Sequence, residues 1–187
     1  MKLAFIDIET GGLDPKINPI LQIAGTFEVG KESQDFNFYI KPFPADKVDA
    51  KALAVNKLDP TKPEFEEPGV VYNRLINILQ KYVNKFDKTD KFFFVGYNSH
   101  QFDMPFIREF FSKNGDKYFG SWFHYPSIDV MILAACKLIN KRCSMPDFKL
   151  ATVARELGIN LDGANFHAGE YDIAITREIF KLLMKGN

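Results

Sequence analysis

Apolar runs separated by turn residues predict three neighbouring strands near the start of the chain. Residues 2–8 hold a compact apolar run that meets acid only at its end, which is typical of a buried central strand. A turn signal follows at residues 10–15, and residues 20–29 and 35–40 have the pattern of a second and a third strand. Because the connections are short, we expect an antiparallel meander.

Helical spacing of apolar residues dominates the rest of the chain. It predicts a helix over residues 70–83, which is followed by a fourth strand over residues 91–97. The other predicted helices cover residues 50–56, 105–113, 128–141, 148–157 and 168–184. Strands followed by strand–helix alternation predict an α/β sandwich, in which helices flank a mixed sheet, in a single domain spanning residues 1–187.

Composition and charge narrow the class of protein. Hydrophobic residues make up 46% and charged residues 26%, and 24 basic residues balance 24 acidic ones. A protein that coats long stretches of nucleic acid is usually basic, so neutrality argues against that class. It does not argue against an enzyme that binds a few nucleotides through metal ions. The chain shows no signal peptide and no membrane span, so we expect a cytoplasmic protein without membrane contact.

The two cysteines, Cys136 and Cys143, lie seven residues apart on a stretch with a helical pattern. This spacing puts them on one face about two turns apart, which is too far for an easy disulfide. We therefore expect two buried thiols in a reducing compartment.

Two acids end the first predicted strand. Asp7 and Glu9 are two residues apart, so in a strand their side chains point to the same side. Burying two neighbouring carboxylates costs several kcal/mol unless a cation intervenes. A hard ion such as Mg²⁺ or Mn²⁺ fits this need. The alternative is a frayed strand end with two solvated acids, and the pair alone favours that alternative.

Three more polar residues stand at the starts of predicted helices. Asp103 follows the fourth strand, and its alternative role is that of a helix N-cap. Asp172 falls on the second turn of the last helix, if that helix begins near His167, and faces the sheet. Neutral imidazole is a good base near pH 7, although a lone His is more often an ordinary surface or core side chain.

The order and context of these five residues resemble the DnaQ-like, or DEDDh, 3′–5′ exonucleases of the ribonuclease H-like superfamily. Residues 5–13 resemble the first motif of the family, residues 98–103 the second, and residues 167–172 the third. Residues 128–134 and 149–159 resemble two further helices. The resemblance implies a three-layer sandwich with a mixed five-stranded sheet.

The sequence departs from the family pattern in two places. Gly169 stands two residues after His167, where the family usually has Ala, and glycine loosens a helix entry. The second motif carries one more residue between Asn98 and Phe102 than many members have, which resembles the exonuclease I branch.

The resemblance implies a two-metal phosphodiesterase that uses two Mg²⁺ or Mn²⁺ ions. It implies that Asp7 bridges both ions and that Glu9 and Asp172 help to hold the ion that binds the attacking water. It implies that Asp103 holds the second ion and that His167 takes the proton from the water. The two ions then share the negative charge of the transition state.

The resemblance also implies contacts with substrate. The backbone at Thr10 and Gly11 is expected to pack against the terminal nucleotide, and Leu13 is the candidate wedge against the last base. An equally good role for Leu13 is to cap the edge of the core. Phe102 is a candidate for base stacking, although aromatics at helical spacing are usually core residues. Asn98 contacts the phosphate strand in one interpretation and only closes a turn in the other.

Three polar residues near the motifs are left outside the predicted site. Asp129 begins a predicted helix and is interpreted as an N-cap. Glu170 points away from Asp172 on a helix, and His100 has no supporting residues.

The leading hypothesis is a metal-dependent 3′–5′ exonuclease that releases nucleoside monophosphates from single-stranded or frayed 3′ ends, with DNA preferred. The same chemistry on RNA is the nearest alternative. A second alternative is a docking or proofreading module with a polymerase or replication partner. A third is another nuclease or transposase of the superfamily, against which the spacing of His167 and Asp172 argues.

Overall fold

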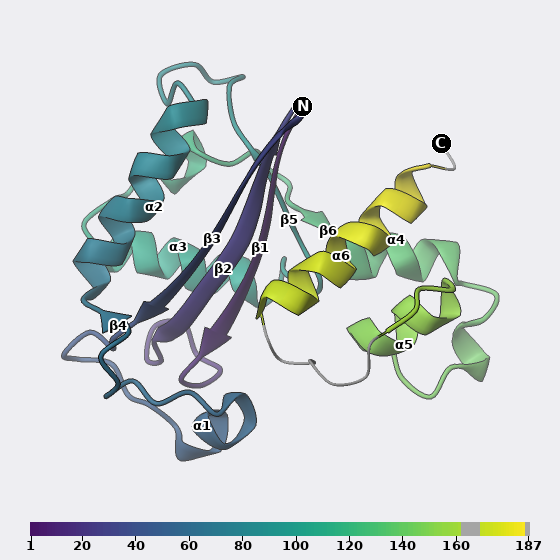
Figure 1. The fold of residues 1–187 in the computed structure, drawn as a ribbon, viewed down its shortest axis with the longest axis horizontal. Helices are drawn as coiled ribbons and strands as arrows, with labels where there is room; N and C mark the ends of the chain where they lie inside the picture. Colours follow the sequence, from purple (N-terminus) through teal and green to yellow (C-terminus); the bar gives the residue numbers. More distant parts are fainter. Residues whose placement is uncertain (162–168, 186–187) are drawn as a thin grey trace.

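The computed structural model describes residues 1–161 and 169–185. The three strands at the start, β1 (Lys2–Thr10), β2 (Ile20–Val29) and β3 (Glu32–Ile40), form the predicted antiparallel meander. Figure 1 shows them side by side at the centre of the molecule. They form the middle of a mixed sheet with the strand order β4-β3-β2-β1-β5-β6.

Within the described residues the sheet has six strands, one more than the five expected. Outside the meander lie β4 (Phe65–Glu66), β5 (Phe93–Gly96) and β6 (Ile128–Asp129), and each pairs in parallel with its neighbour. Strand β5 is the fourth strand predicted over residues 91–97. Strands β4 and β6 have only two residues each, which is too short for any alternation of apolar and polar residues to reveal them.

The described residues form six α-helices, and their bounds follow the predicted ranges closely. They are α1 (Ala50–Asn56), α2 (Pro68–Tyr82), α3 (Asp103–Lys113), α4 (Val130–Lys137), α5 (Leu150–Glu156) and α6 (Gly169–Met184). The largest difference is at α4, which ends four residues early because the chain turns at Leu138 and continues as a 3₁₀ turn, Arg142–Ser144.

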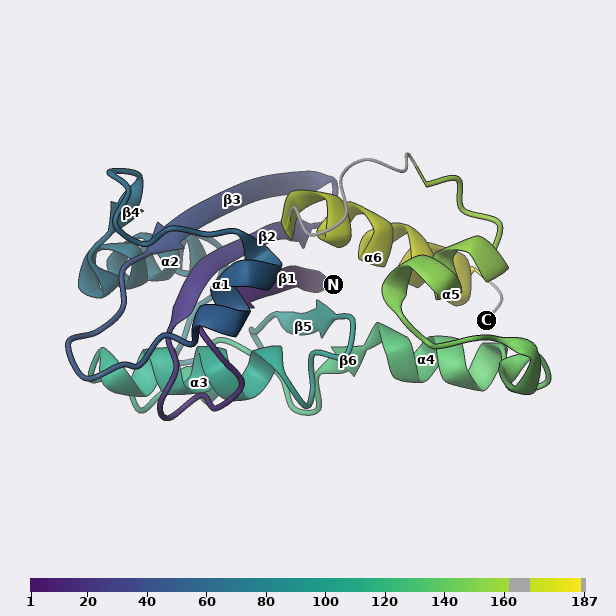
Figure 2. The same ribbon diagram turned by 90° about the horizontal axis from the view of Figure 1, so that it is seen from below.

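Two hydrophobic cores lie on opposite faces of the sheet. Ala4, Ile6 and Ile8 of β1 face one core with α2 and α3, whereas Leu3 and Phe5 face the other with α4, α5 and α6. Figure 2 shows this division of the helices. The predicted three-layer arrangement is therefore confirmed.

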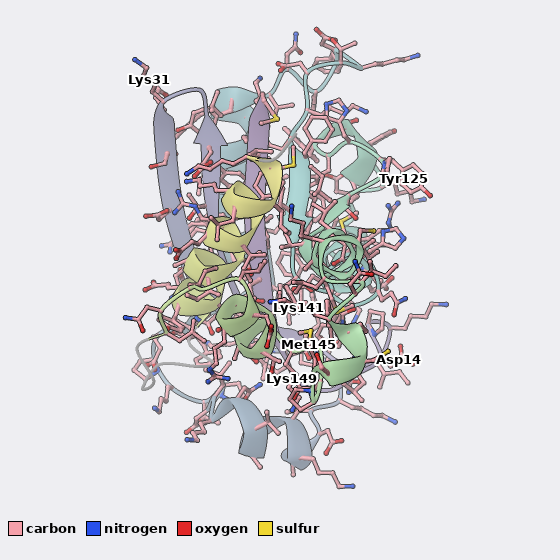
Figure 3. The ribbon with its side chains drawn as sticks, turned by 90° about the vertical axis from the view of Figure 1, so that its right-hand side faces the viewer. Asp14, Lys31, Tyr125, Lys141, Met145 and Lys149 are labelled. Carbon is pink, nitrogen blue, oxygen red and sulfur yellow. The ribbon has the colours of Figure 1, made fainter. Side chains whose placement is uncertain are left out.

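The alternation along β1 determines where its acids lie. Asp7 and Glu9 continue the two-residue spacing of Phe5, so they lie on the face that α6 covers. They stand at the carboxyl end of β1, close to the turn that contains Asp14. Lys31, in the turn between β2 and β3, lies at the other end of the sheet (Figure 3).

The expectation of two buried thiols is wrong. Cys136 and Cys143 are free and exposed. The buried positions in and after α4 are Val130, Ala134 and Leu138, which are four residues apart. Cys136 falls between the last two of these on the outer side of the helix. Separately, none of the helices in the described part of the chain has the length and apolar character needed to cross a bilayer.

Candidate active site

Four acids from three separate elements lie within electrostatic reach of one another. Asp7 and Glu9 stand on β1, Asp103 is the first residue of α3, and Asp172 is in the first turn of α6. The charges of Asp103, Asp172 and Glu9 each raise the pKa of Asp7. The fold therefore brings together four of the five residues predicted for the site.

The pKa values of these acids show how unfavourable their charges are. Burial, followed by the charges of the other acids, raises the pKa of Asp7 well above its ordinary value. Burial and the charge of Asp172 raise the pKa of Glu9 to about 7. Burial raises the pKa of Asp103 to about 7, although backbone hydrogen bonds partly oppose the shift. A group of acids with these properties favours either protons or a cation.

The donor set fits a hard divalent cation. Carboxylate oxygens are the ligands that Mg²⁺ and Mn²⁺ prefer, and a cation would relieve the repulsion among the acids. Within residues 1–161 and 169–185, no three acidic, His or Cys side chains are already gathered tightly enough to hold an ion alone. Mg²⁺ keeps several waters and is usually bound through one or two carboxylates together with substrate phosphate, so such a tight group is not required.

Asp103 does not act as a helix N-cap. The N-cap position of α3 is Phe102, and the backbone N–H of Met104 donates to the Ser99 carbonyl. Asp103 lies inside the helix and is only 5% exposed. Pro105 fits the first turn of α3, where its missing N–H costs nothing. The helix therefore begins two residues before the predicted start and carries Asp103 into the group of acids.

Asp129 caps α4 as predicted and also holds the second motif. Its carboxylate accepts from the N–H of Met131 at 3.0 Å, and it accepts from the N–H groups of Asn98 at 3.0 Å and His100 at 3.1 Å. Asn98 adopts a left-handed conformation with φ of 59°, which fits the turn-closing interpretation. Asp129 thus fixes the loop that leads into Asp103.

Side chains that donate to backbone carbonyls hold the first motif in place. Thr10 donates its hydroxyl to the Gly12 carbonyl at 2.6 Å, and the Asn56 side chain donates to the Thr10 carbonyl at 3.0 Å. A Cβ on Gly12 would lie 2.3 Å from the Asn18 side chain, so any other residue there would have to displace that side chain. The contact of Asn56 ties the first motif to α1, a relation that no pattern in the sequence indicated.

A groove of about 360 Å³ lies beside Glu9. Leu13 lines it and is 84% exposed, so this side chain does not cap the core. Phe102 also lines the groove, with its ring centroid 5.1 Å from that of Phe106, which is a core residue with 2% exposure. The rest of the wall comes mostly from the first motif and α1: Ile8, Thr10, Gly12, Asp49, Lys51, Ala52, Val55 and Asn56.

A second hollow of about 450 Å³ lies on the Asp172 side of the acids. Asn98 and Lys149 line it together with apolar and aromatic residues. Because Glu9 borders one hollow and Asp172 the other, and the two carboxylates interact, the acids lie between two open surfaces.

The remaining polar residues near the motifs lie as follows. His167 lies outside the described residues. Glu170 accepts from the Asn37 side chain on β3 at 3.1 Å and so points away from the acids, as predicted. His100 is exposed, with its Nδ1 3.1 Å from the Ser127 hydroxyl.

Comparison with known proteins identifies the relatives of this chain. An exonuclease family model matches residues 4–180. Ribonuclease T of Shewanella frigidimarina is 28% identical over 188 residues, which cover 96% of this chain and 80% of the relative. Ribonuclease T of Buchnera aphidicola subsp. Schizaphis graminum is also 28% identical, over 94% of this chain and 79% of the relative. A PolC-type DNA polymerase III of Mycoplasmopsis pulmonis is 28% identical over 95% of this chain, which matches 11% of the polymerase.

Solved structures show the same fold. Exonuclease I of E. coli in complex with a dT13 oligonucleotide superposes with a TM-score of 0.77 at 20% identity and covers 97% of this chain. The zinc-bound form of the complex between exonuclease I and single-stranded DNA has the same TM-score and covers 100% of this chain. This chain spans about 40% of the length of exonuclease I. The exonuclease family model matches almost the whole length of this chain. The chain therefore belongs to the exonuclease family and is an enzyme of the DnaQ-like (DEDDh) 3′–5′ exonuclease type in the ribonuclease H-like superfamily.

Proposed function

We propose that the chain removes nucleoside monophosphates one at a time from the 3′ end of single-stranded or frayed nucleic acid, with two bound Mg²⁺ or Mn²⁺ ions. The convergence of four acids from β1, α3 and α6, whose charges raise one another's pKa values, is the observation that carries the proposal. A module that served only for docking would gain nothing from burying these acids together.

Each acid has a role in the proposed mechanism. Asp7 would be the shared ligand of both ions, since its pKa responds to all three other acids. Glu9 and Asp172, whose charges repel each other, would hold one ion, and Asp103 would hold the other. The bound ions would activate a water and stabilise the charge of the transition state. His167 would take the proton of the attacking water, a role that rests on the resemblance of the third motif.

The groove beside Glu9 is the proposed place of the terminal nucleotide. Leu13 offers an exposed apolar surface for the base, and Phe102 offers an aromatic one. Thr10 and Gly11 would meet the nucleotide through the backbone, and Asn98 borders the hollow on the other side of the acids. The strand would thus lie across the acids with its 3′ end in the groove.

DNA is the substrate that we propose first, because solved structures with this fold hold dT13 and dA16 oligonucleotides. RNA is the second candidate, because ribonucleases T are among the sequence relatives that match most of this chain. The match to a PolC-type polymerase supports a replication partner only as a further hypothesis.

The assay that tests the proposal compares three strands. A 5′-labelled single-stranded DNA, a matched RNA and a 3′-blocked DNA are incubated with Mg²⁺, with Mn²⁺ and with EDTA. We expect a ladder that shortens from the 3′ end, requires metal and is absent on the blocked strand. The faster of the two open strands identifies the substrate. Failure to cleave any strand with either metal would contradict the proposed function.

Shortening Leu13 tests the groove. We expect Leu13→Ala to raise KM by about tenfold with kcat nearly unchanged, because burying a leucine side chain contributes about 1.5–3 kcal/mol and 1.4 kcal/mol is a factor of ten. Ile17→Ala is the matched control, since Ile17 is an exposed apolar residue of the same connection that does not line the groove. Equal KM values for both variants would remove Leu13 from the substrate site.

A further inference from the structure

The ion pair between Lys113 and Asp46 joins the last turn of α3 to the segment that leads into α1. We propose that this pair is a positioning device for the substrate groove: it fixes the wall made by α1 against the first-motif loop and thereby sets the affinity for the terminal nucleotide. The inference rests on the proposed function, because it concerns the groove assigned there to the 3′ end.

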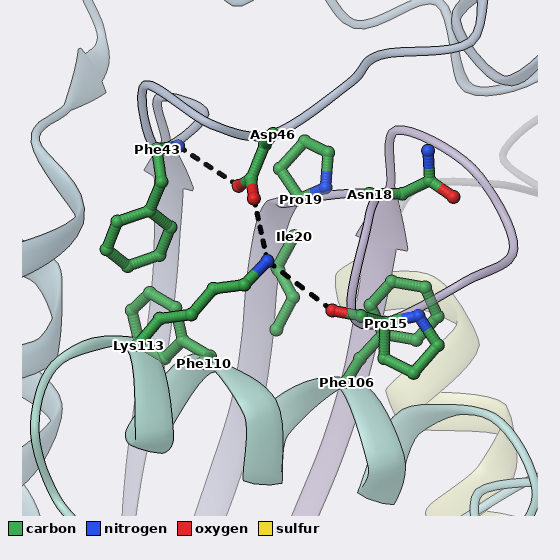
Figure 4. A pocket seen from close by; sticks show the side chains of 9 residues that line it. All are labelled: Pro15, Asn18, Pro19, Ile20, Phe43, Asp46, Phe106, Phe110 and Lys113. Carbon is green, nitrogen blue, oxygen red and sulfur yellow. Dashed lines mark hydrogen bonds and ion pairs between the residues drawn. The ribbon is translucent and has the colours of Figure 1, made fainter.

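The ion pair has well-defined geometry (Figure 4). Lys113 Nζ lies 2.6 Å from Asp46 Oδ1 and 3.5 Å from the Pro15 carbonyl. The second oxygen of Asp46 accepts from the N–H of Phe43 at 3.0 Å. One lysine therefore contacts both connections that flank the groove, the one after β1 and the one after β3.

The surroundings of the pair are largely apolar. Asp46 has a side chain that is 2% exposed, and that of Lys113 is 20% exposed. The ring of Phe43 lies 5.8 Å from the ammonium group, and Phe106 and Phe110 line the same small pocket. Its internal volume of about 10 Å³ leaves space for about one water. With so little solvent, loss of the lysine would leave a buried carboxylate without its counter-charge, which favours rearrangement of the segment.

The two connections are also bonded to each other. Asn18 donates to the Lys47 carbonyl at 2.7 Å, and the N–H of Lys47 donates to the Ile17 carbonyl at 2.9 Å. The N–H of Asp49 donates to the Gly11 carbonyl at 2.7 Å. Residues 11–19 and 43–49 therefore form one unit, and Lys113 anchors this unit to α3.

This unit carries the groove. Gly12 and Leu13 line it from the first connection, and Asp49 and the α1 residues line it from the second. Because α3 begins with Asp103 and ends at Lys113, one rigid helix links the acids to the anchor. Release of the anchor is expected to shift the groove while leaving the acids in place.

The kinetic test uses Lys113→Met. We expect KM to rise by about tenfold with kcat within about twofold of the original, the pattern of lost substrate binding without lost chemistry. Lys113→Arg is expected to restore most of the affinity, because a guanidinium group keeps the charge and the donors. Lys117→Met, which removes an exposed lysine just beyond α3, is the matched control and is expected to behave like the original protein.

Amide hydrogen exchange tests the same inference without any substrate. Lys113→Met is expected to speed exchange across residues 43–56 and to leave β1 and β2 unchanged. If the original protein cleaves no strand, the proposed function fails, and the exchange result alone still decides whether Lys113 positions the wall.

Two results would overturn the inference: unchanged exchange in residues 43–56, or a fall in kcat with KM unchanged. Should Lys113→Met fail to fold, Asp46→Asn takes its place, because it removes the charge and keeps an acceptor for the N–H of Phe43. The same outcomes then apply to that variant.

Discussion

Replacing Asp7 with Asn is expected to abolish cleavage, with a loss of more than about a thousandfold, since metal ions contribute several kcal/mol to such reactions and 1.36 kcal/mol is tenfold in rate. The same change is expected to raise the melting temperature of the metal-free protein by at least about 2 °C, because about 1 kcal/mol shifts the melting temperature of a domain of this size by 2–4 °C. The reason is that Asn removes one charge from a group of acids that repel one another.

The pH dependence of stability follows from the same pKa shifts. Folding raises the pKa of Glu9 from 4.5 and that of Asp103 from 3.8, both to about 7. At pH values between about 4 and 7, the folded state therefore binds more protons than the unfolded state. The stability of the metal-free protein falls as the pH rises through this range. Mn²⁺ is expected to restore stability at pH 7.5, and this gain is expected to be lost in Asp7→Asn.

Thermal melts at pH 5.5 and 7.5, with and without Mn²⁺, measure both effects. Glu170→Gln is the matched control, because it neutralises an exposed acid in the first turn of α6 whose carboxylate accepts from Asn37. An Asp7→Asn protein that melts below the original without metal would count against a charge-repelling metal site.

Replacing His167 with Ala is expected to lower kcat by about 10²–10⁴, the usual contribution of a general base, with the affinity for Mn²⁺ unchanged. Metal affinity is measured by the stabilisation of the fold as Mn²⁺ is added. A loss of Mn²⁺ affinity as large as the loss of kcat would indicate that His167 is a metal ligand. An unchanged kcat would indicate that His167 has no role in catalysis.

The control for this variant is His100→Ala. His100 lies within the second motif, and its ring nitrogen is 3.1 Å from the Ser127 hydroxyl on the exposed surface. Its removal is expected to leave both kcat and the response to Mn²⁺ as they were.

The parts of the fold that could be predicted are those with a long periodic pattern. The strand predicted at residues 2–8 agrees with β1 to within two residues at each end. The helix predicted at residues 70–83 agrees equally well with α2. Strands β4 and β6 could not be predicted, because two residues carry no period and exist as strands only through their partners. The exposure of Cys136 was missed because the buried face of α4 follows Val130 and Ala134 at a four-residue spacing, and Cys136 lies outside that face.

The candidate site was predictable as a set of residues and not as an architecture. Asp7, Glu9, Asp103 and Asp172 could be chosen because their order and context resemble the motifs of the DEDDh exonucleases, and the structure brings their charges together. The second role of Asp129 depends on contacts about thirty residues away in the chain, which leave no local signal. The wall that α1 contributes to the groove also depends on contacts between distant parts of the chain, which leave no local signal.

The start of α6 has a consequence for the charge state of the acids. Gly169 opens this helix so close to β1 that a Cβ there would lie 3.6 Å from Asp7 Oδ2. The amino end of a helix carries the positive end of its dipole, equivalent to about half an elementary charge. Asp7 therefore stands at the positive pole of a sixteen-residue helix, which acts as a built-in counter-charge and opposes part of the rise in its pKa that burial and the neighbouring acids cause.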